Sequence, residues 1–297
     1  MRHLCVERGR KGTSGIEDGS SCRTTNIEKC VEIAEMCGIA GYSFHRASRV
    51  DRTLAAQALL AGIAERGADA AGYAYRGTAG DLSFHKQRSG ASALLDRLAI
   101  PQEANQAILH VRDYTKGHPG IEANNHPVRH GAVKGIHNGI IVNDEEIFAR
   151  YGFERHEPDM TVDSEAIFAL VDAYGPTPEV LEELCGSMAT AWFDEREPDT
   201  VYIARGVGRP LWLGEGLSEA FFASTKKTLE VVERYLGVTL RKRELPEGIL
   251  VPLVEGRRQK AIRFRPDSAF EETPLPAVRA PQEGVTCLRL LAAIAAV

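Results

Sequence analysis

The stretch Met36-Cys37-Gly38-Ile39-Ala40-Gly41 places a cysteine directly before a short apolar run, which predicts a strand over Ile39–Phe44. A cysteine in such a setting is most often a small residue of the core, so the stretch alone indicates no chemistry. The polar segments that follow it along the chain change this interpretation, because they occur together and in one order. They read His110-Val-Arg112-Asp-Tyr-Thr115-Lys-Gly117, Asn125-His126-Pro127, His137-Asn138-Gly139-Ile140 and Asp163-Ser-Glu165.

In their order and spacing these segments resemble the glutaminase domain of class II glutamine amidotransferases, the N-terminal-nucleophile (Ntn) hydrolases with an N-terminal cysteine. The likeness is nearest to the glutaminase half of glucosamine-6-phosphate synthase, and it covers about residues 36–255. The resemblance implies an α+β fold, the Ntn-hydrolase four-layer αββα sandwich of two packed antiparallel sheets. Three further segments continue it, and they read Arg66-Gly-Ala-Asp69-Ala-Ala-Gly72, Ala204-Arg205…Pro210-Leu211 and Phe222-Ala223-Ser224.

Local patterns point the same way, because runs of strands interrupted by helices favour a layered α+β sandwich. Apolar periodicity predicts helices over Asp51–Glu65 and Val162–Ala173, and Gly67 supplies a stop for the first. The further predicted strands are short β-branched or aromatic runs. They cover Gly72–Arg76, Leu82–Lys86, Ala107–Val111, Ala189–Phe193, Thr200–Ala204, Ala220–Ala223 and Ile249–Val254.

Composition divides the chain into three parts. Residues 1–36 are rich in glycine, serine, threonine and charge, so they are expected to be a disordered extension, a propeptide or a mis-assigned start. Residues 37–265 form the predicted class II glutamine amidotransferase (glutaminase) domain. Residues 266–297 begin with many proline and glutamate residues and are expected to be a linker with a short C-terminal tail.

Composition also excludes several classes of protein. With 43% hydrophobic and 26% charged residues, the 297-residue chain resembles an ordinary folded protein, and its formal net charge of −5 gives no reason to expect binding to nucleic acid or a membrane. No apolar run approaches the roughly 20 residues of a membrane helix, and residues 1–35 lack the apolar part of a secretory signal. No cysteine pair has CxxC spacing, so a zinc site is unsupported. We expect no metal and no cofactor. We therefore expect a cytoplasmic protein.

The resemblance implies that Cys37 is the catalytic nucleophile. An amide is a poor electrophile, and a thiolate that forms a thioester divides its hydrolysis into two easier steps. If Cys37 is the first residue of the mature chain, its own α-amine lies beside the sulfur and acts as the base. The family pattern assigns the oxyanion donors to the side-chain amide of Asn138 and the backbone N–H of Gly139. Taken alone, an Asn-Gly pair is more often a turn.

Recognition of glutamine needs one cation and one anion, because its head group is a zwitterion. In the family pattern Arg112 takes the α-carboxylate, for which a planar guanidinium is suited, and Asp163 takes the α-ammonium. Both residues also have ordinary interpretations, as an arginine after a strand and as an aspartate that caps a helix with Glu165 in its first turn. Thr115 and His126 match further positions around the substrate pocket.

Two positions depart from the family pattern. Asp113 stands where the aminosugar synthases carry tryptophan, and Lys116 stands where they carry histidine. An acid beside an arginine that binds a carboxylate weakens glutamine binding unless Lys116 or the orientation of the acid offsets its charge.

The residues ahead of Cys37 are a further departure, because they turn its α-amine into a peptide nitrogen that cannot act as a base. Two explanations remain. Either translation begins at Met36, whose removal exposes Cys37, or the extension is a propeptide that is cut off.

The sequence therefore predicts a glutamine amidotransferase subunit that hydrolyses L-glutamine to glutamate and ammonia through a cysteinyl thioester. The 42 residues beyond residue 255 fit neither the isomerase half of aminosugar synthases nor the ATP-using half of asparagine synthetases. We therefore expect the ammonia acceptor on a separate synthase or modifying enzyme. The alternatives are a non-catalytic module of the same fold that senses glutamine or scaffolds a partner, and an Ntn amidase that acts on another amide.

Overall fold

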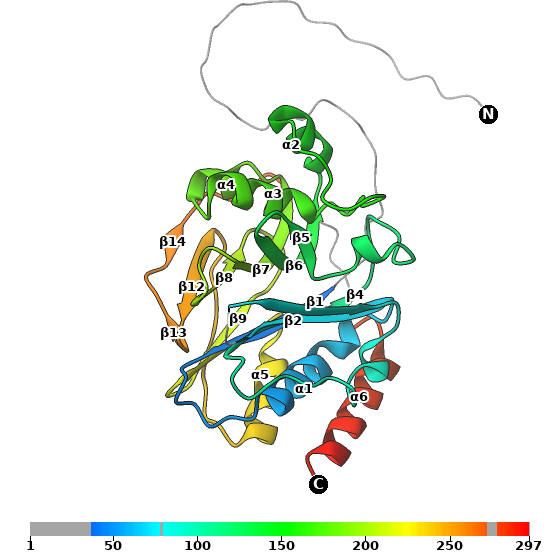
Figure 1. Ribbon diagram of the computed structural model, residues 1–297, viewed down its shortest axis with the longest axis vertical. Helices are drawn as coiled ribbons and strands as arrows, with labels where there is room; N and C mark the ends of the chain where they lie inside the picture. The colour runs from blue at the N-terminus through cyan, green and yellow to red at the C-terminus, as the bar shows by residue number, and fades with distance from the viewer. Residues whose placement is uncertain (1–36, 78–79, 272–277, 297) are drawn as a thin grey trace, which may run out of the picture. The chain divides into compact units, whose positions relative to one another are not determined.

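The computed structural model describes residues 37–77, 80–271 and 278–296. The predicted extension over residues 1–36 lies outside these described residues. Within them the chain forms two antiparallel sheets that face one another, with helices on both outer faces (Figure 1).

The first sheet has seven strands in the order β11-β9-β10-β1-β4-β2-β3. Its central strand β1 pairs with β10 on one side and with β4 on the other. The strands of this sheet are β1 (Gly38–Phe44), β2 (Ala70–Arg76), β3 (Leu82–Gln87), β4 (Gln106–Arg112), β9 (Trp212–Glu215), β10 (Glu219–Ala223) and β11 (Arg241–Glu244).

The second sheet runs in the order β13-β12-β8-β7-β6-β5, and β14 pairs with β12 beside this path. Its long strands β6 and β7 pair along their whole length, from Val133 opposite Asp194 to Ile141 opposite Gly186. The strands of this sheet are β5 (Val128–His130), β6 (Val133–Ile141), β7 (Gly186–Asp194), β8 (Thr200–Arg205), β12 (Ile249–Val254), β13 (Arg257–Arg258) and β14 (Ile262–Arg263).

Helices cover the outer face of each sheet (Figure 1). The first sheet is covered by α1 (Arg52–Ile63), α5 (Lys226–Leu236) and α6 (Pro281–Ile294). The second is covered by α2 (Asp144–Tyr151), α3 (Glu165–Tyr174) and α4 (Pro178–Glu182). The short 3-10 turns are η1 (Ala64–Arg66), η2 (Ala91–Ala93) and η3 (Glu122–Asn124).

The apolar core between the sheets joins side chains from both of them. Ile39 and Ile108 of the first sheet pack with Ile136, Ala191 and Phe193 of the second, and all five are fully buried. Separate apolar clusters lie between each sheet and its helices. The predicted α+β fold, a four-layer αββα sandwich of two packed antiparallel sheets, is confirmed.

Strand β1 is buried on both faces, which explains why it lacks the alternation of a half-exposed strand. Ile39 points into the core between the sheets, whereas Tyr42 and Phe44 pack under the helices. Gly41 is required there, because an added Cβ would lie 2.4 Å from the carbonyl oxygen of Ala107. Because β1 is packed tightly on both faces, it fixes the position of Cys37, which directly precedes it.

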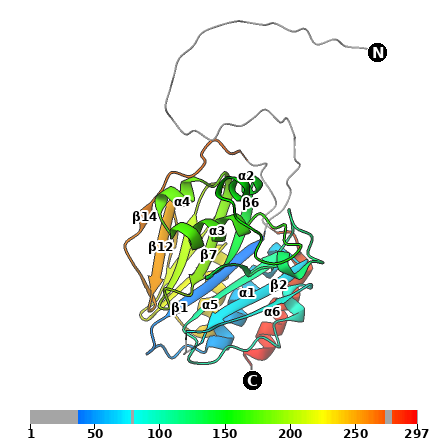
Figure 2. The same cartoon turned by 45° about the horizontal axis from the view of Figure 1, so that its top comes forward.

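The helix layer on the first sheet contains two helices that local sequence patterns did not predict. Helix α5 begins after Thr225, whose hydroxyl accepts from the backbone N–H of Thr228. Helix α6 lies in the predicted tail, and it packs beside α1 (Figure 2) through the fully buried Cys287 and Leu291. Among the helices of the described residues, none has both the length and the apolar character needed to cross a membrane.

Candidate functional site

The start of β1, the end of β4 and the middle of β6 come together at one place between the sheets. Ile39 on β1 lies opposite His110 on β4. The Nε2 of His110 donates across the gap to the backbone carbonyl of His137 on β6, at 3.0 Å. Cys37 precedes Ile39 by two residues and Asn138 follows His137 directly. The fold therefore brings these two predicted residues into one region.

Cys37 is half-buried, and its Sγ donates to the backbone carbonyl of Asp113 at 3.3 Å. Its own carbonyl accepts from Nε of Arg66 at 2.9 Å. Burial raises the pKa of the Cys37 thiol to about 11, although Arg112 and the buried Arg209 act in the opposite direction. The thiol is therefore neutral at pH 7, and a nucleophilic role requires a base that removes its proton.

Asn138 is fully buried on β6, and neither its Nδ2 nor its Oδ1 has a hydrogen-bond partner among the described residues. An unsatisfied buried amide opposes folding by about 1–3 kcal/mol, so such a group needs an explanation. Gly139 follows with φ of 144°, and an added Cβ would lie 2.0 Å from the carbonyl oxygen of Ser187. This pair is not the turn that an Asn-Gly sequence usually forms, because both residues lie inside β6.

Arg112 is buried at the end of β4 and organises the loop that follows. Its Nη1 donates to the carbonyl of Asn124 at 2.6 Å and to Oδ1 of Asn125 at 2.7 Å. Its Nη2 donates to the carbonyls of Lys116 and Gly117, at 2.8 and 2.5 Å. The guanidinium is therefore fixed in position by several acceptors, which the strand-end pattern alone did not predict.

Asp163 is buried, and its Oδ2 accepts from the backbone N–H of Ile141 at 2.7 Å. Helix α3 begins one residue later than a cap at Asp163 requires, with Ser164 in the N-cap position. Burial raises the pKa of the Asp163 carboxyl to about 6, whereas the bond from Ile141 acts against this shift. Among the described residues no ion pair includes Asp163, so its charge has no direct counter-ion there.

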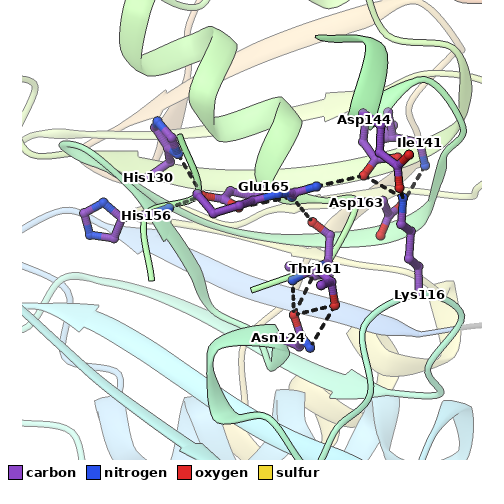
Figure 3. A network of polar contacts seen from close by, with 12 residues as sticks. Lys116, Asn124, His130, Ile141, Asp144, His156, Thr161, Asp163 and Glu165 are labelled. Atoms are coloured by element: carbon purple, nitrogen blue, oxygen red, sulfur yellow. Dashed lines mark hydrogen bonds and ion pairs between the residues drawn. The ribbon is translucent and has the colours of Figure 1, made fainter. Parts of the chain in front are cut away.

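Lys116 does not turn toward Asp113. Its Nζ lies 2.8 Å from Oδ1 of the buried Asp144 and 3.1 Å from Glu145, both at the start of α2. Figure 3 shows Lys116 beside both Asp144 and Asp163. The sequence reasoning did not identify Asp144, because only the fold brings the start of α2 against the loop.

The network of Figure 3 continues from Asp144 to the start of α3. Arg155 bonds both Asp144 Oδ2, at 3.2 Å, and Glu165 Oε2, at 3.1 Å. Glu165 also accepts from Nδ1 of His130 and from the backbone N–H of His156. These contacts hold the starts of α2 and α3 together on either side of the loop that carries Asp163.

His126 is buried and stacks on His110, with ring centroids 4.2 Å apart. Neither ring nitrogen of His126 has a hydrogen-bond partner among the described residues. Burial, together with His110 and Arg112, lowers the pKa of His126 well below 6.5, so its ring is neutral. Thr115 lies half-exposed on the loop after Arg112.

A cavity of about 500 Å³ lies at the other end of β1, where Phe44, Arg46 and Arg76 are among the lining residues. Its lining contains none of the predicted site residues. In the part of the chain that the structure describes, no cluster of three or more histidine, cysteine or acidic side chains could hold a metal ion.

Comparisons with known proteins identify the family of the domain. A family model described as a glutamine amidotransferase domain matches residues 117–231. The glutamine–fructose-6-phosphate aminotransferase (isomerizing) of Vibrio parahaemolyticus is 30% identical over 225 residues, which cover 72% of this chain and 34% of the relative. The chain contains a class II glutamine amidotransferase domain. The corresponding enzyme of Escherichia coli O6:H1 is 32% identical to this chain over 212 residues, which cover 67% of the chain and 33% of the relative.

Solved structures show the fold of this amidotransferase domain as well. The glutamine phosphoribosylpyrophosphate amidotransferase from B. subtilis matches with a TM-score of 0.59 and 21% identity, over 77% of this chain and 49% of that one. The sandwich is therefore that of the Ntn-hydrolase amidotransferases. The chain spans about a third of the length of its curated relatives.

The raised pKa of Asp163 predicts a pH-dependent cost in stability. The folded state holds this proton more tightly than the unfolded state, where the carboxyl has its ordinary pKa of 3.8. The cost of the buried charge is therefore absent below about pH 4 and complete above the folded pKa of about 6. Asp163→Asn should unfold at a higher denaturant concentration than the unmodified chain at pH 8, and this advantage should shrink toward pH 4.5.

The exposed Asp96 supplies the matched control, because Asp96→Asn should leave the unfolding midpoint unchanged at both pH values. An Asp163→Asn variant that is less stable than the unmodified chain at pH 8 would show that the buried charge of Asp163 does not destabilise the folded state.

Proposed function

We propose that the domain hydrolyses L-glutamine to glutamate and ammonia through a cysteinyl thioester at Cys37. The observation that carries this proposal is the buried amide of Asn138, which has no hydrogen-bond partner among the described residues and lies on β6, a strand that contacts β1. A buried amide without a partner lowers the stability of the folded protein. It gains a hydrogen bond when an oxyanion forms beside it in the transition state. In this proposal Asn138 Nδ2 and the backbone N–H of Gly139 donate to that oxyanion.

The proton of the thiol must leave before sulfur attacks. The raised pKa of Cys37 means that water does not remove the proton at neutral pH, so a base must lie close to the sulfur. We assign this role to the α-amine of Cys37 in a chain that begins there. Sulfur bonds to the amide carbon, the α-amine carries the proton to the departing ammonia, and water then cleaves the thioester to release glutamate.

The head group of glutamine would lie between two buried charges. The Asp163 carboxylate has no counter-ion among the described residues, which supports its assignment to the α-ammonium. Arg112 is assigned to the α-carboxylate through its positive charge, because its four Nη–H groups already donate to oxygens of the loop that follows β4. Thr115 and His126 are proposed to complete the pocket.

The acceptor of the ammonia is proposed to lie on a separate synthase or modifying enzyme. The curated relatives are named glutamine–fructose-6-phosphate aminotransferases (isomerizing), so a sugar phosphate is one class of acceptor that such a partner could hold. A glutamine-sensing or scaffold module remains the second candidate. The unpaired Asn138 amide favours the enzyme, since a scaffold gains nothing from the cost of that burial.

Ammonia release from L-glutamine tests the proposal directly. A chain that begins at Cys37 should release ammonia, whereas a chain whose intact mass shows residues 1–36 retained should be inactive, because its nitrogen at Cys37 is an amide. Cys37→Ala in the shorter chain should abolish release, and Cys287→Ala should not. Activity of a homogeneous chain beginning at Met1 would overturn the α-amine as the base.

The role of Asn138 has its own kinetic test. Removal of one oxyanion donor lowers kcat by roughly 10²–10³-fold, because the interaction exists only in the transition state. Asn138→Ala should therefore lower kcat for glutamine with little change in KM. Asn138→Asp keeps the size of the side chain but loses the donor, so it should be equally impaired. A variant that changes KM alone would show that Asn138 only shapes the pocket.

A further inference from the structure

The C-terminal segment of the chain is anchored next to the candidate site. The backbone N–H groups of Arg279 and Ala280 both donate at 2.9 Å to the carbonyl of Glu65, which lies in η1 directly after α1. Gly284 lies against Glu65 so closely that an added Cβ would be 2.7 Å from the Glu65 Cβ. Further along α6, the buried Leu291 joins the apolar layer under the first sheet. Figure 2 shows α6 beside α1.

Two sets of hydrogen bonds connect this C-terminal segment to Cys37. On one side, Arg66 follows Glu65 and its Nε donates to the carbonyl of Cys37 at 2.9 Å. On the other side, Nε of Arg279 donates to Oδ2 of Asp113 at 3.0 Å, and the backbone carbonyl of Asp113 accepts the Cys37 thiol. Asp113 is thus held through its side chain by the C-terminal segment while its backbone receives the nucleophile.

The ion pair also has an electrostatic consequence for the nucleophile. The Asp113 carboxylate raises the pKa of Cys37, since a nearby negative charge disfavours the thiolate. Lys116 does not offset this charge, because its ammonium is bound to Asp144 and Glu145. Arg279 carries the cation that pairs with Asp113, and both side chains are less than a third exposed.

We propose that Arg279 is a positioning residue for Cys37. By pairing with Asp113, it holds the backbone carbonyl that receives the thiol and compensates the carboxylate that the family pattern does not have at this position. The C-terminal segment that ends in α6 is therefore part of the site. The assignment to glutamine hydrolysis rests on the proposed function, but the effect on the reactivity of Cys37 does not.

A double-mutant cycle in the full chain separates this role from simple docking of α6. The four proteins carry Arg or Gln at position 279 in combination with Asp or Asn at position 113. The first measurement is the rate at which iodoacetamide alkylates Cys37 at pH 7.5, followed by mass spectrometry of the Cys37 peptide. The second measurement is ammonia release from glutamine, with the same four combinations of residues placed in chains that begin at Cys37.

Arg279→Gln should slow alkylation of Cys37 by roughly fivefold when Asp113 is present, the size expected for a partly exposed ion pair. The same substitution should change the rate by less than about twofold in the Asp113→Asn background, since the charge that it compensates is gone. Arg279→Lys should restore most of the rate. Arg289→Gln, on the exposed face of α6, is the matched control and should have no effect.

Equal effects of Arg279→Gln in both backgrounds, or no effect in either, would overturn the proposal. Coupling in the alkylation rates without ammonia release by any of the proteins would instead retain the positioning role of Arg279 and refute the proposed function. The two failures are therefore distinguishable.

Discussion

The packing of β1 and β4 against β6 across the gap between the sheets is the constraint on which the site depends. Ile39 and Ile136 are fully buried in that gap, and the bond from His110 to the His137 carbonyl fixes the relative position of the two sheets. Because close apolar packing fixes the two sheets, the polar groups beside this core cannot move to form hydrogen bonds with one another. For this reason the amide of Asn138 stays buried without a hydrogen-bond partner in the described part of the chain.

The site therefore contains several buried polar groups that have no partner among the described residues. Asn138 lacks partners, both ring nitrogens of His126 lack partners among the described residues, and the Asp163 carboxylate is buried without a counter-ion there. Each such group costs on the order of 1–3 kcal/mol. Three apolar clusters offset this cost, and the polar network from Lys116 through Asp144 to Arg155 keeps the surrounding loop ordered. Substrate recognition and transition-state stabilisation are the functions for which such groups are retained.

Local strand and helix patterns predict a layered α+β sandwich, because periodicity is a local property, whereas the four-layer αββα arrangement comes from the family resemblance. The helix predicted over Asp51–Glu65 corresponds to α1, with Asp51 as its N-cap. Helix α5 was missed although Thr225 marks its start. Contacts that join distant segments could not be predicted, since Arg279 is 166 residues from Asp113 and no spacing rule connects them. The sequence reasoning identified the charge problem at Asp113 but sought its solution in Lys116, only three residues away.

The central claim is that Cys37 attacks a glutamine held by this site. A chain that begins at Cys37, treated with an electrophilic analogue of glutamine, tests it most directly by intact mass and peptide mapping. The account predicts one adduct per chain, located on Cys37, whose formation is suppressed by excess L-glutamine but not by L-asparagine. Formation of the adduct on Cys287, or on Cys37 at a rate that glutamine does not change, would contradict the claim.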